Sequence, residues 1–162
     1  MPKIIIIKGS SRKNGNTHKV VEALLDRLEA TYIDLQDYQI SYYDYEHKNS
    51  EDDFLMIAEK MVQYDYIIFA TPIYWYTMSA IMKTFFDRLS DLLTIRKDLG
   101  RALKGKTMSA IACSSDETEY EGFFLPFERT AEYLEMHWGG GVHTWVEGEV
   151  VPDKVRLRLQ EL

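Results

Sequence analysis

The feature that most constrains the fold is a run of four consecutive isoleucines, Ile4 to Ile7. Successive side chains of a β-strand point to opposite faces, so a strand made of these residues must be buried on both sides. Such strands are typical of the middle of a parallel sheet that helices cover on both faces. The run leads into the polar segment "KGSSRKNGNT", residues 8–17, and then into apolar residues at helical spacing from Val20 to Leu28. We therefore expect the chain to begin with a strand, a loop and a helix.

The same alternation continues along the chain. Strands are predicted at residues 3–8, 31–35, 64–72, 107–113 and 142–146, with the third ending at Pro72. Helical patterns lie after residue 16, at 54–63, 79–93 and 123–136, and from residue 153. In the third of these helices, Lys83, Asp87 and Asp91 form the predicted polar side. The pattern predicts a single α/β domain over residues 1–162, a flavodoxin-like three-layer α/β/α sandwich with a five-stranded parallel sheet of order 2-1-3-4-5.

Composition excludes several classes of protein. The longest apolar runs are too short to cross a bilayer and the first residues do not resemble a secretory signal, so we expect a cytoplasmic protein without membrane association. The formal net charge of −7 argues against nucleic-acid partners. Cys113 is the only cysteine, which excludes an intrachain disulfide, a cysteine zinc site and a cluster held by four thiolates. Its place at the end of an apolar strand favours a buried, inert thiol, and we predict no metal site.

The segment 8–17 is suited to binding an anion. It offers hydroxyl and amide side chains, the cations Lys8, Arg12 and Lys13, and no carboxylate. Its spacing fits neither a P-loop nor a dinucleotide-binding loop, because Asn16 stands where a P-loop has lysine and Ser11 where a dinucleotide loop has its second glycine. A terminal phosphate at the start of the following helix fits better. The alternative is an ordinary polar turn in which Asn16 or Thr17 caps the helix.

The predicted topology brings three loops together. Ligands of open α/β sheets bind beyond the carboxyl ends of the strands, where the strand order reverses. Residues 9–17, 71–79 and 113–122 should meet there. The segment 36–53 has no sustained period and is predicted to be a loop on the same side.

Two motifs together resemble the NAD(P)H-dependent FMN reductase family, "GSSRKNGNT" and "TPIYWYTMSAIMKTFFDR", and the likeness extends over roughly residues 3–147. The resemblance implies a set of residues that surround the FMN phosphate, with Ser11 supplying loop backbone: Ser10, Ser11, Arg12, Asn14, Asn16 and Thr17. It implies that Pro72, Ile73, Tyr74 and Trp75 lie against the isoalloxazine ring, with Trp75 as the preferred neighbour. It also implies that the third loop, Cys113 to Asp116, approaches the pyrimidine side of the ring through Ser114, Ser115 and Asp116. Core or subunit-interface packing is the alternative for the aromatic residues.

One departure from related flavoproteins affects the source of electrons. Iron–sulfur flavoproteins carry a compact cysteine motif in the region that here reads "ISYYDYEHKNSEDD", and this segment contains no cysteine. We therefore expect no cluster, and expect electrons to reach the flavin from NADH or NADPH, between which the sequence does not choose.

The resemblance implies an FMN-dependent NAD(P)H oxidoreductase that passes electrons to a small acceptor, such as a quinone, flavin, nitro or azo compound. Because the flavin carries the chemistry, we predict no separate catalytic residue. The resemblance also implies a homodimer or higher homo-oligomer. The alternatives are an FMN-binding electron carrier that docks protein partners through its acidic surface, and a scaffold that binds no FMN.

Overall fold

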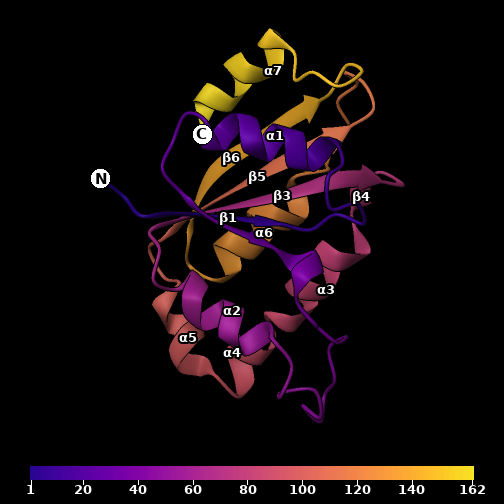
Figure 1. The fold of residues 1–162 in the computed structure, drawn as a ribbon. Coiled ribbons are helices and arrows are strands. Elements are labelled where there is room, and N and C mark those ends of the chain that lie inside the picture. The colour runs from indigo at the N-terminus through magenta and orange to yellow at the C-terminus, as the bar shows by residue number, and fades with distance from the viewer.

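The computed structural model describes residues 1–162 and is built on one twisted sheet (Figure 1). Five parallel strands lie in the order β2-β1-β3-β5-β6, which confirms the predicted topology. They are β1 (Ile4–Lys8), β2 (Thr31–Asp34), β3 (Tyr66–Tyr74), β5 (Thr107–Ser114) and β6 (His137–Trp145). A sixth strand, β4 (Thr77–Met78), was not predicted. It pairs antiparallel with the end of β3 and so forms a hairpin at one rim of the sheet.

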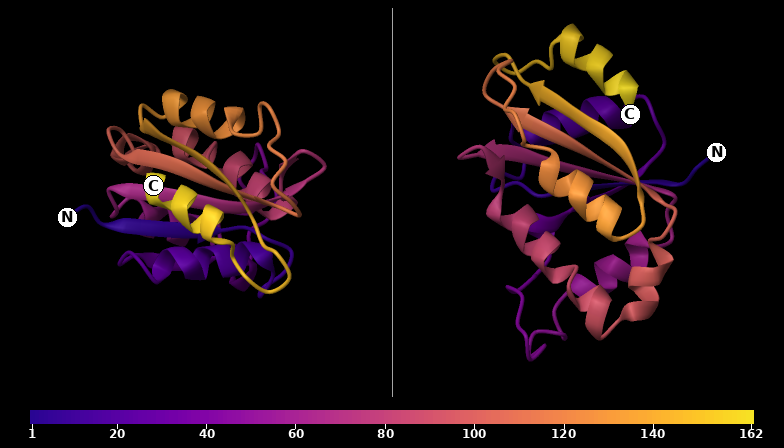
Figure 2. Two further views of the ribbon diagram at one scale, coloured as in Figure 1. Left: turned by 90° about the horizontal axis from the view of Figure 1, so that it is seen from above. Right: turned by 180° about the vertical axis from the view of Figure 1, so that it is seen from behind.

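Helices cover both faces of the sheet, as Figures 1 and 2 show. One face carries α1 (Asn16–Leu25) and α7 (Asp153–Arg158). The other carries α2 (Phe54–Met61), α3 (Ala80–Arg88), α4 (Asp91–Thr94), α5 (Lys97–Ala102) and α6 (Leu125–Tyr133). Short 3-10 turns follow β2 at Leu35–Asp37 and α7 at Leu159–Glu161. None of the helices is long and apolar enough to cross a membrane.

The isoleucine run of β1 forms the centre of the structure. Ile5 and Ile7 pack into the core beneath α2, α3 and α6, whereas Ile6 packs into the core beneath α1 and α7. All three are fully buried. The alternation of a pleated strand therefore divides the apolar side chains between two cores, as the sequence predicted.

The third strand does not end at Pro72, which corrects the sequence prediction. Instead β3 continues to Tyr74, and Pro72 pairs with Cys113 of β5. On the other side of β3, the carbonyl of Ala70 accepts from the N–H of Gly9 just beyond β1. Backbone groups alternate in direction, so the nitrogen of Pro72 faces the side where β1 has already ended. The missing donor therefore costs no ladder hydrogen bond.

The helix predicted over residues 79–93 is interrupted after Arg88, and α4 begins at Asp91. Asp91 is fully buried and does not belong to an exposed polar face. Its carboxylate accepts from Nε of the buried Arg88 at 2.8 Å and lies 3.1 Å from Nδ1 of His47. Arg88 also donates to Asp52 at 2.5 Å and to the carbonyl of Ser41 at 3.0 Å. This network fixes the predicted loop 36–53 to the end of α3.

The last strand begins five residues earlier than predicted, at His137. Its added residues include Gly139 and Gly141, and a Cβ at Gly141 would lie 2.4 Å from the ring of Phe124. Glycine thus lets the segment before α6 lie directly on the strand. Figure 2 shows α6 crossing β5 and β6 on this face.

Candidate functional site

A cavity of about 300 Å³ lies at the carboxyl ends of β1, β3 and β5, and we call it the three-loop cavity. Each of the three loops that the sequence placed at this rim contributes to its wall. The lining residues are Ser10, Arg12, Gly15, Asn16, Thr17, Pro72, Ile73, Tyr74, Cys113, Ser114, Ser115 and Tyr120. The volume falls at the lower end of the range that is typical of small-molecule sites.

The first wall is the loop between β1 and α1, and it presents free backbone donors. The helix begins at Asn16 with Gly15 at the N-cap, where no side chain makes a capping hydrogen bond. The alternative in which Asn16 or Thr17 caps the helix is therefore wrong. No hydrogen bond within the chain engages the N–H groups of residues 13, 14 and 16–18. Together with the positive end of the α1 dipole, they form a site suited to an anion.

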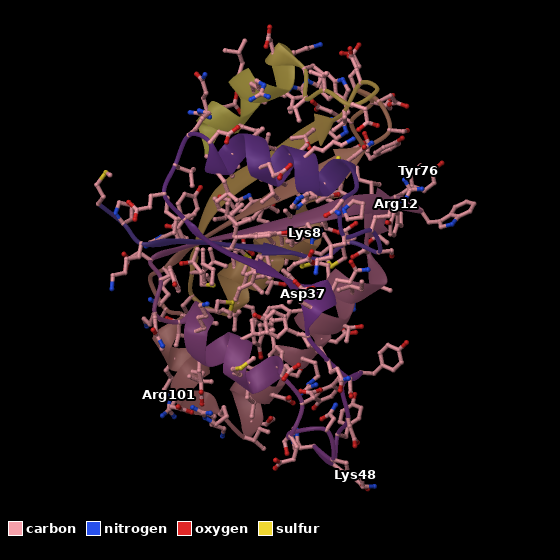
Figure 3. The ribbon with its side chains drawn as sticks, in the orientation of Figure 1. Lys8, Arg12, Asp37, Lys48, Tyr76 and Arg101 are labelled. Carbon is pink, nitrogen blue, oxygen red and sulfur yellow. The ribbon has the colours of Figure 1, made fainter.

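The charges around this loop single out Arg12. Lys8 is buried and pairs with Asp34 at 2.8 Å, and Lys13 pairs with Asp37 at 2.5 Å. The hydrogen bond and attraction of Asp37 raise the pKa of Lys13. Arg12 forms no ion pair, and Figure 3 shows it at the end of the molecule toward which the strands run. Of the three cations in the segment, only Arg12 makes no ion pair within the chain.

The second wall is the hairpin formed by β3 and β4. Trp75 and Tyr76 form its two-residue turn, with φ of 49° and 68°. Bulky residues seldom adopt this left-handed conformation. Trp75 is 91% exposed and does not line the cavity. Tyr74 does line it, and Tyr76 packs edge-on against Tyr120 with 5.3 Å between the ring centroids.

A buried serine fastens the hairpin to the first loop. Ser79 caps α3 by accepting from the N–H of Met82 at 3.1 Å, and its hydroxyl donates to the carbonyl of Gly9 at 2.7 Å. Its own N–H donates to the Thr71 hydroxyl at 3.0 Å. A Cβ at Gly9 would lie 3.0 Å from the nitrogen of Met82, so glycine permits this close approach. The relative position of two cavity walls therefore depends on Ser79.

The third wall follows β5. The Ser114 hydroxyl lies 2.8 Å from Nε2 of His143 and 2.5 Å from the carbonyl oxygen of Asp116. Burial lowers the pKa of His143, which favours the neutral ring. Burial also raises the pKa of the Cys113 thiol, and hydrogen bonds with Thr144 and Thr17 oppose this only in part. Cys113 is therefore a protonated thiol at neutral pH, with little nucleophilic character.

The structure brings together nine of the thirteen residues predicted to contact FMN. In the cavity wall are Ser10, Arg12, Asn16, Thr17, Pro72, Ile73, Tyr74, Ser114 and Ser115. Outside the wall are Ser11, Asn14, Trp75 and Asp116. The sequence did not single out Gly15 or Tyr120 as contacts, whereas it placed Cys113 at the start of the third loop on the pyrimidine side. Of Gly15 and Tyr120, only Gly15 carried a signal, as the residue before the helix. As contacts of bound FMN, all thirteen residues stay predictions.

The donors and walls of the cavity fit FMN. Unpaired N–H groups, the free Arg12 guanidinium and the hydroxyls of Ser10 and Thr17 suit a phosphate. A Cβ at Gly15 would lie 2.9 Å from Cβ of Arg12, so glycine permits the Arg12 side chain to lie close to the start of α1. Away from the phosphate loop, Ile73, Tyr74 and Tyr120 offer apolar and aromatic surface for a planar ring.

Comparisons with known proteins agree with this geometry. YwqN of Bacillus subtilis (strain 168), named as an NAD(P)H-dependent FMN-containing oxidoreductase, is 33% identical over 155 residues, covering 91% of this chain and 84% of that protein. The solved structure of the Trp repressor binding protein from Bacillus subtilis has a TM-score of 0.76 at 28% identity, covering 98% of this chain and 94% of the other.

A more distant structure shares the fold. An FMN-dependent NADH-azoreductase from Bacillus anthracis, solved in complex with FMN, has a TM-score of 0.66 at 12% identity, covering 98% of this chain and 95% of the other. The model of the NADPH-dependent FMN reductase family matches residues 2–121, well over half of the chain. The chain therefore belongs to the NADPH-dependent FMN reductase family, as an oxidoreductase whose cofactor is FMN and whose electron donor is NADH or NADPH.

Proposed function

We propose that this protein carries electrons from NADH or NADPH, through FMN in the three-loop cavity, to a small organic acceptor such as a quinone, a flavin, a nitro compound or an azo compound. The observation that carries the proposal is the polarity of the cavity. One end has unpaired N–H groups and Arg12, and the other has Ile73, Tyr74 and Tyr120. A phosphate joined to a planar ring matches both ends.

In this proposal the chain binds and orients the cofactor. The loop 10–17 holds the phosphate through backbone N–H groups, Arg12 and the hydroxyls of Ser10 and Thr17. The β3–β4 hairpin meets the ring with its backbone and with Tyr74, and Ser114 and Ser115 meet the pyrimidine edge. Tyr120, packed against Tyr76, helps to exclude water from the ring.

The lining offers no obvious general acid or base. It contains no Asp, Glu or His side chain, and its one thiol is kept protonated by burial. When bound, FMN supplies the two-electron chemistry. The task left to the protein is to fix the ring, admit donor and acceptor in turn, and set the polarity around the ring.

The test is a visible absorption titration of the purified protein with FMN, followed anaerobically by NADH and then by NADPH in the same cuvette. We expect saturable binding and bleaching, and the faster of the two donors would show the preferred nicotinamide. Replacing Asn16 and Thr17 together by alanine should weaken FMN binding, whereas Thr130→Ala on α6, outside the cavity wall, should not. Wild-type protein that binds FMN but is not bleached by either nicotinamide would favour the electron-carrier alternative.

Three further predictions from the sequence belong to this proposal: a single domain, a homodimer and a cytoplasmic location. Static light scattering of the purified protein measures its mass in solution, and a mass of 19.0 kDa would contradict the dimer. A single cooperative transition by calorimetry would support one domain. Cell fractionation would test the location.

A further inference from the structure

The phosphate loop rests on a fully buried lysine. Lys8 ends β1, and its Nζ lies 2.8 Å from a carboxylate oxygen of Asp34 at the end of the neighbouring strand β2. The same nitrogen donates to the carbonyl of Lys13 at 2.6 Å and to that of Arg12 at 3.4 Å. Lysine is almost never fully buried unless its charge is paired, and here all three ammonium donors have an acceptor.

A second tie reaches the loop from the same place. Asp34 accepts from the N–H of Gln36 at 3.1 Å and so caps the short turn after β2. The Gln36 side chain then donates to the carbonyl of Ser11 at 2.9 Å. Three consecutive loop carbonyls, those of Ser11, Arg12 and Lys13, are thus held by side chains that Asp34 positions.

The held carbonyls determine where the loop N–H groups point. In a trans peptide, the carbonyl of one residue and the N–H of the next point in opposite directions, and the chain has no cis peptide bond. With the carbonyls of Arg12 and Lys13 turned inward to Lys8, the N–H groups of Lys13 and Asn14 must point outward. Neither of them donates within the chain. Figure 3 shows Lys8 set back within the molecule, behind the rim where Arg12 lies.

We infer that Lys8 and Asp34 are positioning residues for the phosphate loop, which hold its carbonyls inward so that its N–H groups face a bound phosphate. This inference rests on the proposed FMN site and deepens it. The Lys8 charge is neutralised by Asp34, so its contribution is geometric, and the free charge that meets the phosphate is that of Arg12. Loss of Lys8 should therefore weaken binding of a phosphorylated flavin and spare a flavin that lacks the phosphate.

The experiment compares affinities for FMN and for riboflavin, measured by quenching of flavin fluorescence. In Lys8→Met, we expect the preference for FMN over riboflavin to fall by roughly tenfold or more, with riboflavin affinity nearly unchanged. Gln36→Ala, which releases only the Ser11 carbonyl, should lower the preference in the same direction by a smaller factor. Lys106→Met is the matched control. The Lys106 Nζ also donates to a backbone carbonyl, that of Tyr64 at 2.8 Å, but neither residue belongs to the cavity wall.

The outcomes separate the inference from the proposed function. Wild-type protein that binds FMN no better than riboflavin would overturn the phosphate site itself. Wild-type protein with a clear preference for FMN, retained within twofold in Lys8→Met and in Gln36→Ala, would overturn the positioning role alone. If Lys8→Met fails to fold, as its circular dichroism would reveal, the exposed Gln36→Ala variant still decides the question.

Discussion

Replacing Ser79 with alanine should destabilise the protein by about 2–4 kcal/mol, because one hydroxyl makes two buried hydrogen bonds. It accepts from the N–H of Met82 as the cap of α3, and loss of such a cap costs about 1 kcal/mol. It also donates to the buried carbonyl of Gly9, and an unpaired buried carbonyl costs about 1–3 kcal/mol. The Ser79 N–H bond to Thr71 survives in the variant.

Urea unfolding followed by far-ultraviolet circular dichroism gives the free energy of unfolding of wild-type and variant protein. The midpoint should fall while the slope with urea stays constant. Ser90→Ala is the control, because Ser90 also stands at a helix N-cap, that of α4, but its side chain makes no capping hydrogen bond. A loss below about 0.5 kcal/mol in Ser79→Ala, equal to the effect expected for the control, would refute the reasoning.

Three other variants test separate features. Arg88→Met leaves Asp52 without its buried partner and should cost about 3–5 kcal/mol by urea unfolding. Burial opposes ionisation of Asp52, but hydrogen bonds led by that of Arg88 hold its pKa below the ordinary 3.8. The stability from Asp52 is present above pH 3.8 and is lost as the pH falls through the lowered pKa. The difference in unfolding free energy between variant and wild type should therefore narrow in acid. A difference that stays constant with pH would contradict this. Trp75→Asn combined with Tyr76→Gly should raise the unfolding free energy by about 1–3 kcal/mol, because both residues have positive φ, and an unchanged value would show that the turn is unstrained. Gly141→Ala should lower the melting temperature, since its Cβ would collide with an aromatic ring 2.4 Å away, and an unaltered melting temperature would show that the ring moves freely.

The topology and the meeting of the three loops could be predicted because both follow from local patterns. Four isoleucines in a row leave no polar face, so β1 had to be central. Once five strands alternate with helices, the rules of parallel sheets fix which loop ends lie together. The sequence could therefore place two segments, Gly9 to Thr17 and Pro72 to Tyr74, at one cavity without information on their side-chain contacts.

What could not be predicted depends on partners distant in sequence. Pro72 stays within β3 only because β1 ends opposite it. Asp91 appeared to belong to a solvent-facing stripe, and its burial depends on Arg88 together with residues more than 30 positions earlier. Tyr120 lies at the cavity because it packs on Tyr76, and no hydrophobic periodicity in the sequence indicates this contact. The carboxylates that pair with Lys8 and Lys13 lie on the neighbouring strand and on the turn after it. The composition of the loop alone therefore indicated three free cations where only one lacks an ion pair.

The three-loop cavity draws its wall from the carboxyl ends of β3 and β5 and from the loops that follow β1 and β5, so it exists only while these three strands remain paired. A ligand bound there raises the free energy of every opening motion that separates these strands, and this free energy grows with the logarithm of the ligand concentration. Of the two edge strands, β6 contributes no residue to the wall and can fray without breaking it, whereas β2 supports the phosphate loop through Asp34. Amide hydrogen exchange should therefore slow in β1, β3 and β5 when ligand is added and change least in β6, so that the pattern of slowed exchange identifies the part of the fold that opens as one unit.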